Sequence, residues 1–216
     1  MDFWILAGIP TTSFLVALSG ALMPGPLLTV TVGEAARRGF WAGPLLMVGH
    51  ALLEGALVIL LLVGVGAWLN RPVILGSVAV LGAAMLGWMG LALVKASRHS
   101  RLELDAQSPA GLHPVAAGVL MSLANPYWLL WWLTIGLGYV IFAQKYGLLG
   151  VALFYVGHIL ADLAWYSLVS GAVAQGRRFL SDNLYRGFLA VCGVFLFIFG
   201  GYFGIQGLRF FLTGLI

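Results

Sequence analysis

Two short motifs each place a histidine and a carboxylate four residues apart in otherwise apolar sequence. His50 precedes Glu54 and His158 precedes Asp162, and a glycine stands directly before each histidine. If these segments are helical, the two side chains of each pair share one helix face. Such pairs can exchange protons, bind a substrate cation or supply ligands to a metal ion. The alternative interpretation is structural, with each histidine satisfying its own acid.

The composition indicates what surrounds these groups. Of the 216 residues, 62% are hydrophobic and 8% are charged, whereas soluble domains are about 25% charged. We therefore expect an integral membrane protein whose partner is the lipid bilayer. The single cysteine, Cys192, excludes an intramolecular disulfide and dithiol redox chemistry. The net charge of +4 is spread over short loops, so no nucleic-acid partner is expected.

Apolar runs of at least about 18 residues predict six membrane-spanning helices. They lie at about 5–30, 42–68, 72–95, 114–140, 147–173 and 186–209. The runs are continuously apolar and do not alternate as the strands of a membrane barrel would, so we expect an all-α membrane protein. Glu54 and Asp162 then lie near the middle of the bilayer. An ionised carboxylate costs about 2.5–3.5 kcal/mol there and needs polar partners.

Basic residues between the spans predict the orientation of the chain. One set of alternate loops contains Arg37, Arg38, Lys95, Arg98, Arg101, Arg177, Arg178 and Arg186. The other set contains Arg71, Lys145 and Arg209. Loops rich in lysine and arginine face the cytoplasm. We therefore expect a multi-pass protein with both termini extracytoplasmic and with the polar segment 96–113 in the cytoplasm.

Residues 1–95 and 114–216 match each other at three places in the same order. The matching segments are Met23–Leu27 with Ala124–Trp128, Gly49–Glu54 with Gly157–Asp162, and Gly87–Lys95 with Gly201–Arg209. Three spans per repeat would place the second repeat upside down relative to the first. We therefore predict two inverted three-helix repeats, 1–95 and 114–216, joined by the linker 96–113. Inverted repeats are chiefly a transporter architecture, because one half can rock against the other.

Prolines at matching positions predict that the first helix of each repeat is broken. Pro24, Pro26 and Pro126 each lack an amide hydrogen and clash with the preceding helical turn. The freed carbonyls and the new helix N-terminus can hold a cation and an anion. The predicted substrate-binding residues are Pro24, Gly25, Pro26, Asn125 and Pro126. We expect both breaks to lie near mid-membrane and next to each other; the alternative is a simple kink.

Three tryptophans lie on one side of the fourth predicted helix. They are Trp128, Trp131 and Trp132, and Tyr127 stands directly before the first of them. Tryptophan clusters in membrane proteins typically anchor helices at the lipid interface. That interpretation is favoured here over a substrate-contacting wall. The Arg37-Arg38-Gly39 segment is interpreted as a cytoplasmic anchor in a loop.

The chain resembles the lysine-exporter (LysE/RhtB-type) family of bacterial translocators over nearly its whole length. The resemblance rests on the Pro24-Gly25-Pro26 motif, the Arg37-Arg38-Gly39 segment and Asn125-Pro126. This resemblance implies a six-helix secondary transporter in the bacterial inner membrane. It implies export of amino acids or related small metabolites, driven by protons. No cofactor and no enzymatic activity are expected. A homo-oligomer is compatible with this sequence.

Two transport mechanisms remain open at this stage. In the first, the substrate carboxylate binds at the helix breaks and its ammonium lies near Glu54 and Asp162, while His50 and His158 control protonation. In the second, the same four residues bind a divalent cation such as Zn²⁺ or Mn²⁺, and the protein is a metal permease. An enzyme is the third and least favoured class, because the chain contains no His-Glu-x-x-His motif.

Overall fold

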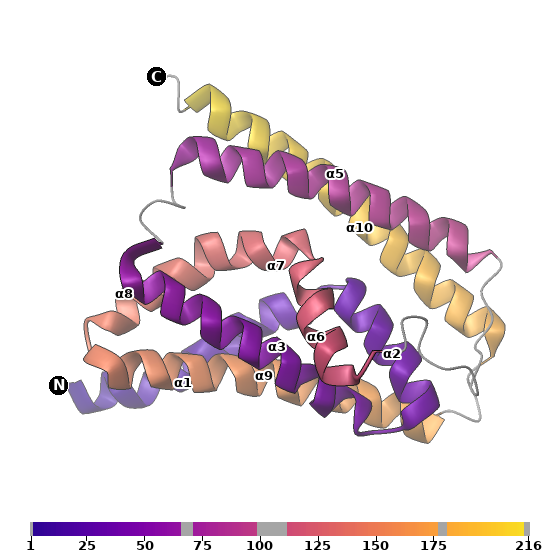
Figure 1. Cartoon of the computed structure of the whole chain (residues 1–216), viewed down its shortest axis with the longest axis horizontal. Helices are drawn as coiled ribbons and strands as arrows, with labels where there is room; N and C mark the ends of the chain where they lie inside the picture. The colour runs from indigo at the N-terminus through magenta and orange to yellow at the C-terminus, as the bar shows by residue number, and fades with distance from the viewer. Residues whose placement is uncertain (1, 66–70, 99–111, 177–180, 214–216) are drawn as a thin grey trace.

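A computed structural model describes residues 2–65, 71–98, 112–176 and 181–213, and the regular structure within them is helical (Figure 1). The first half contains α1 (Asp2–Ala21), α2 (Pro26–Arg38), α3 (Ala42–Leu60), the π-helical turn η1 (Leu61–Val65) and α5 (Pro72–Ser97). The second half contains α6 (Pro114–Leu123), α7 (Pro126–Trp131), the π-helical turn η2 (Trp132–Gly136), α8 (Leu137–Gln144), α9 (Gly147–Gly176) and α10 (Asp182–Thr213).

Four described helices are long and apolar enough to cross a bilayer. They are Ala42–Gly64, Gly76–Lys95, Gly147–Gly176 and Asp182–Arg209, and they correspond to the second, third, fifth and sixth predicted spans. Residues 66–68 of the second predicted span lie outside the described residues. The bent pair α1 and α2 makes a fifth span if it crosses once. The all-helical membrane architecture is confirmed, whereas the six-span arrangement stays a prediction.

The first predicted helix, 5–30, is broken as expected, but its predicted bounds are wrong. α1 ends at Ala21, and α2 starts at Pro26 at an angle of 84° to α1. Proline is tolerated at the first position of a helix because its missing N–H has no helical partner there. α2 continues to Arg38 and ends at Gly39, whose φ of 82° suits glycine. The arginine pair therefore belongs to the last turn of α2, not to the loop expected.

The fourth predicted helix, 114–140, is divided into short pieces. α6 ends at Leu123, and the Asn125 side chain accepts the N–H of Tyr127 at 3.1 Å, which caps α7. η2 follows α7, and α8 extends beyond the predicted end to Gln144. The two breaks adjoin, because a Cβ built on Gly25 would lie 3.4 Å from Asn125 Nδ2. The interruption and proximity of the two helices are thus confirmed, and their depth in the bilayer stays a prediction.

Close helix contacts join the two halves of the chain. A Cβ built on Gly49 of α3 would lie 1.9 Å from the Val115 carbonyl oxygen of α6. A Cβ on Gly157 of α9 would lie 2.3 Å from the Pro10 carbonyl oxygen of α1. α5 and α10 run side by side along their length (Figure 1). Each half of the chain therefore packs on the other. The repeat relation between the halves stays a prediction, and so does the linker 96–113, most of which lies outside the described residues.

Candidate functional site

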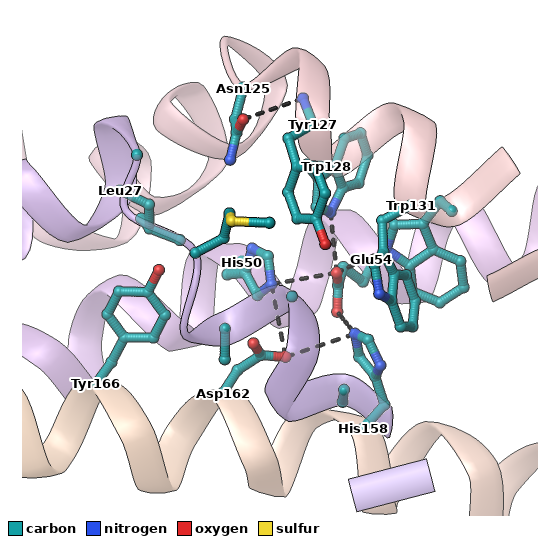
Figure 2. A pocket seen from close by; sticks show the side chains of 16 residues that line it. Leu27, His50, Glu54, Asn125, Tyr127, Trp128, Trp131, His158, Asp162 and Tyr166 are labelled. Atoms are coloured by element: carbon teal, nitrogen blue, oxygen red, sulfur yellow. Dashed lines mark hydrogen bonds and ion pairs between the residues drawn. The ribbon is translucent and has the colours of Figure 1, made fainter. Parts of the chain in front are cut away.

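α3 and α9 bring the two predicted His and acid pairs together. His50 and Glu54 lie on α3, and His158 and Asp162 lie on α9. Each of the four is at most 6% exposed. Figure 2 shows the four side chains pointing toward one another. We call these four residues the His–acid cluster.

Each histidine of the cluster contacts the acid on its own helix and the acid on the other. His50 Nε2 lies 3.1 Å from Glu54 Oε1 and 3.7 Å from Asp162 Oδ2. His158 Nε2 lies 3.0 Å from Glu54 Oε2 and 3.5 Å from Asp162 Oδ2. The interpretation in which each histidine satisfies only its own acid is therefore wrong, since the four groups form one cluster.

The two carboxylates of the cluster have different environments. Glu54 Oε1 also accepts the indole N–H of Trp128 at 2.9 Å and that of Trp132 at 2.7 Å. Indole nitrogen can only donate, so it matches an ionised carboxylate oxygen, which can only accept. Glu54 Oε1 therefore has three polar contacts, whereas Oε2 has only its ion-pair contact with His158 and no hydrogen bond among the described residues. In the described part of the chain, Asp162 has only the two longer histidine contacts.

The expectation that the tryptophans are interfacial anchors is wrong. Trp132 is 0% exposed and Trp131 is 5% exposed, so both belong to the protein interior. The Trp131 ring lies 4.8 Å from the His158 ring, measured between centroids. The four-residue spacing of Trp128 and Trp132 was the sequence signal for two indole donors on one helix face.

Ser122 of α6 fixes the orientation of one histidine, a role not predicted from the sequence. Its Oγ lies 2.7 Å from His50 Nδ1 and donates its hydrogen to the Gly118 carbonyl oxygen, also at 2.7 Å. Because the hydroxyl hydrogen is used there, His50 must donate Nδ1–H to Ser122, and its Nε2 faces the acids. His158 Nδ1 has no hydrogen-bond partner among the described residues. The two histidines are therefore not equivalent.

A pocket connects the His–acid cluster to both helix breaks. It encloses about 470 Å³ of space, counting its open mouth. It is lined by Ala17, Gly20, Ala21, Met23, Gly25, Leu27, His50, Glu54, Asn125, Tyr127, Trp128, Trp131, Trp132, His158, Asp162 and Tyr166 (Figure 2). Of the predicted substrate-binding residues, Gly25 and Asn125 line the pocket. The three prolines do not, and they act by shaping the breaks.

Three residues of the cluster have the geometry of a metal site. His50, Glu54 and Asp162 each offer one ligand atom, and these atoms lie within 4.8 Å of one another. His158 is not part of this set among the described residues. The arrangement therefore offers three of the four ligands expected from the sequence.

Glu34 of α2 is a buried acid outside the pocket that sequence reasoning missed. It is 1% exposed and forms ion pairs with Arg37 and, at 2.6 Å, with Arg38 Nε. The signal was its spacing of three and four residues from the two arginines. The two arginines therefore form ion pairs within α2 as well as making the end of that helix basic.

Comparison with known proteins identifies the family of the chain. The sequence model of the LysE type translocator family matches residues 18–207. The chain is also similar to the Bacillus subtilis (strain 168) protein named "Putative amino acid efflux protein YcgF", with 26% identity over 199 residues, 90% of this chain and 94% of that protein. No solved structure shows a significant match to the chain. The chain therefore belongs to the LysE type translocator family and is a multi-pass membrane transporter, not an enzyme.

Proposed function

We propose that this protein exports amino acids from the bacterial cytoplasm across the inner membrane in exchange for protons. One observation carries the proposal: a single pocket joins two helix breaks to a buried cluster of two carboxylates and two histidines. An amino acid has an anionic and a cationic group, and the pocket offers complementary partners for each. The name of the similar Bacillus subtilis protein supports amino acids as the substrate class.

The substrate carboxylate is assigned to the helix breaks. The first turn of α2 has no side-chain cap, and Leu27 in that turn lines the pocket. Free backbone N–H groups at a helix start favour an anion. The Asn125 side-chain oxygen is occupied by Tyr127, and its Nδ2 lies close to Gly25. Backbone and amide donors therefore converge on one end of the pocket.

The substrate ammonium is assigned to Asp162. Glu54 Oε1 already accepts two indole N–H groups, at 2.9 and 2.7 Å, and Glu54 lies 3.0–3.1 Å from both histidines. Asp162 has two contacts, at 3.5 and 3.7 Å, and it lines the pocket. It therefore has acceptor capacity for an incoming cation, whereas Glu54 is a fixed anion.

Proton exchange follows from counting charges in the cluster. A close contact between an imidazole nitrogen and a carboxylate oxygen requires a proton between them. If both rings are imidazolium, with a proton on Nδ1 as well as on Nε2, their two positive charges balance the two carboxylates and the buried cluster is neutral, as a low-dielectric site favours. A substrate ammonium adds one positive charge. Release of one proton restores neutrality, which gives an exchange of one proton for one amino acid.

Alternating access completes the proposal. The halves 1–95 and 114–216 are proposed to be inverted repeats that rock about the pocket, opening it to one side and then to the other. Contacts of α3 with α6 and of α9 with α1 give each half a surface on which the other can move. The orientation predicted from the basic loops, with both termini extracytoplasmic, belongs to the same proposal.

The experiment is amino acid efflux from proteoliposomes under an imposed proton gradient. Glu54→Gln and Asp162→Asn should abolish gradient-driven efflux while the folded protein stays in the membrane, because the amides keep volume but cannot ionise. His50→Ala or His158→Ala should shift the pH profile. Asp182→Asn, outside the pocket, is the control and should transport normally. Full pH-dependent efflux by the Glu54→Gln, Asp162→Asn double variant would refute proton exchange at this cluster.

Transport of a divalent cation is the second candidate. It is favoured by the three ligand atoms of His50, Glu54 and Asp162 and by the Ser122 contact, which leaves His50 Nε2 directed at the other ligands. A divalent cargo would displace both protons of the cluster, whereas an amino acid would displace one. The two candidates are distinguished by the number of protons released on binding, measured by calorimetry in buffers of different ionisation enthalpy. Release of two protons per Mn²⁺, with no response to amino acids, would replace the first proposal.

A further inference from the structure

We propose that the pocket selects amino acids with uncharged, apolar side chains and that Gly20 of α1 sets their size. This inference rests on the proposed export of amino acids and names the substrate class. It follows from where the charges of the pocket lie and from what lines the remaining space.

All the formal charge of the pocket lies in the His–acid cluster. None of the described residues that line the pocket is a lysine or an arginine. Glu54 already accepts two indole N–H groups and lies 3.0–3.1 Å from both histidines, whereas Asp162 lies 3.5 and 3.7 Å from them. Asp162 is therefore the carboxylate more available to an incoming cation. The substrate's own ammonium uses it. No formal charge remains to balance a charged substrate side chain.

A second charge on the substrate would therefore be buried without a partner. Burying an unpaired ionised group costs several kcal/mol. The tryptophan faces could offset part of that cost for a cation, because a cation over an aromatic ring gains about 0.5–2 kcal/mol. This gain is smaller than the cost. An acidic side chain has no such help, because no lysine or arginine lines the pocket in the described residues.

Apart from Asn125 and the hydroxyls of Tyr127 and Tyr166, the rest of the lining is mostly apolar, and it leaves room on the α1 side. Trp128, Trp131 and Trp132 come from α7 and η2, and Ala17, Gly20 and Ala21 form one face of α1. A Cβ on Gly20 would lie 3.6–3.7 Å from the nearest Trp131 atoms, which is ordinary contact. Alanine therefore fits at position 20, whereas a longer side chain would have to take space inside the pocket.

A panel of substrates tests the charge rule. Purified protein in liposomes is loaded separately with alanine, leucine, phenylalanine, lysine, arginine or glutamate, and efflux is measured under one proton gradient. We expect alanine, leucine or phenylalanine to leave at least about tenfold faster than the three charged amino acids. Efflux of lysine, arginine or glutamate at a rate equal to that of leucine would overturn the charge rule.

A matched pair of variants tests the size rule. Gly20→Leu should lower efflux of leucine and phenylalanine relative to alanine by about tenfold or more, since small differences in packing discriminate by about 10–200-fold. Gly8→Leu adds the same side chain to the same helix, where a Cβ meets nothing within 4 Å, and should leave the ratio unchanged. Gly20→Ala should shift the ratio in the same direction by less. An equal loss for all three substrates in both Gly20 variants would refute the size rule.

These outcomes separate this inference from the proposed function. If no amino acid on the panel is transported but Mn²⁺ is, the proposed function itself fails. If charged amino acids are transported in preference, amino acid export stands and the inference about side-chain class is wrong.

Discussion

The glycine before each histidine is predicted to be essential for stability and for the geometry of the site. Gly49→Ala would place a Cβ 1.9 Å from the Val115 carbonyl oxygen, and Gly157→Ala would place one 2.3 Å from the Pro10 carbonyl oxygen. Both neighbours are backbone atoms, so no side-chain rotation can relieve the clash. The helices themselves must separate.

The size of the effect follows from these distances. Ordinary Cβ contacts begin near 3.4 Å, so α3 must move from α6 by more than 1 Å in Gly49→Ala. Overpacking of this kind costs about 1–3 kcal/mol. We expect about 3 kcal/mol for Gly49→Ala and about 2 kcal/mol for Gly157→Ala, which has the smaller overlap. The first variant also stretches the 2.7 Å contact between His50 and Ser122, because Ser122 lies on α6.

Thermal unfolding in detergent, followed by tryptophan fluorescence, measures this loss. Both variants should melt below wild type, Gly49→Ala the lower, and efflux per folded molecule should fall in Gly49→Ala. Gly87→Ala is the control, since its Cβ meets nothing within 4 Å and it should melt like wild type. Wild-type melting and efflux in Gly49→Ala would show that the inferred closeness of α3 and α6 is wrong.

Further predictions concern the hydrogen-bond donors of the site, the buried acid Glu34 of α2 and the orientation of the chain in the membrane. Trp132→Phe removes the 2.7 Å donor to Glu54 and should shift the pH profile of efflux, so an unchanged profile contradicts the role given to that indole. Ser122→Ala leaves a buried imidazole N–H unpaired and should cost about 1–3 kcal/mol in unfolding experiments; equal stability would refute the hydrogen bond. Glu34→Gln should destabilise by a similar amount, roughly 1–3 kcal/mol, because Arg37 loses its partner, and the free energy of unfolding checks it. A periplasm-active reporter fused to the C-terminus should be active, and activity of a cytoplasmic reporter there instead would reverse the predicted orientation.

The positions of the helix breaks could be predicted from the sequence, but their geometry could not. Prolines at 24, 26 and 126 showed where backbone hydrogen bonds must be lost. The 84° turn between α1 and α2 depends on how α2 packs against α9, which is tertiary information. The extension of α2 to Arg38 was missed because a charged pair after an apolar run was interpreted as a loop. Glu34, which pairs with both arginines, keeps that turn helical.

The residues of the His–acid cluster could be identified from the sequence because polar groups in an apolar chain need partners. Which groups meet could not be predicted, since the spacing of His50 and Glu54 fixes neighbours on one helix only. The tryptophans were misassigned for a related reason. In a chain whose lipid-facing and interior residues are both apolar, hydrophobic periodicity does not distinguish the two sides of a helix. Only the contacts of Trp128 and Trp132 with Glu54 show that this side faces inward.

The unequal hydrogen bonding of the two histidines has an energetic consequence for the proposed cycle. In a transporter built from two identical inverted halves, the inward-facing and outward-facing states would have equal free energies. Here His50 is held by Ser122, while His158 Nδ1 has no partner in the described structure. Exchanging the roles of the halves therefore does not reproduce the same set of hydrogen bonds. In the proposed cycle, a difference of one hydrogen bond, about 1 kcal/mol, would populate one state about fivefold over the other, so the resting protein would favour one side of the membrane before any gradient is applied.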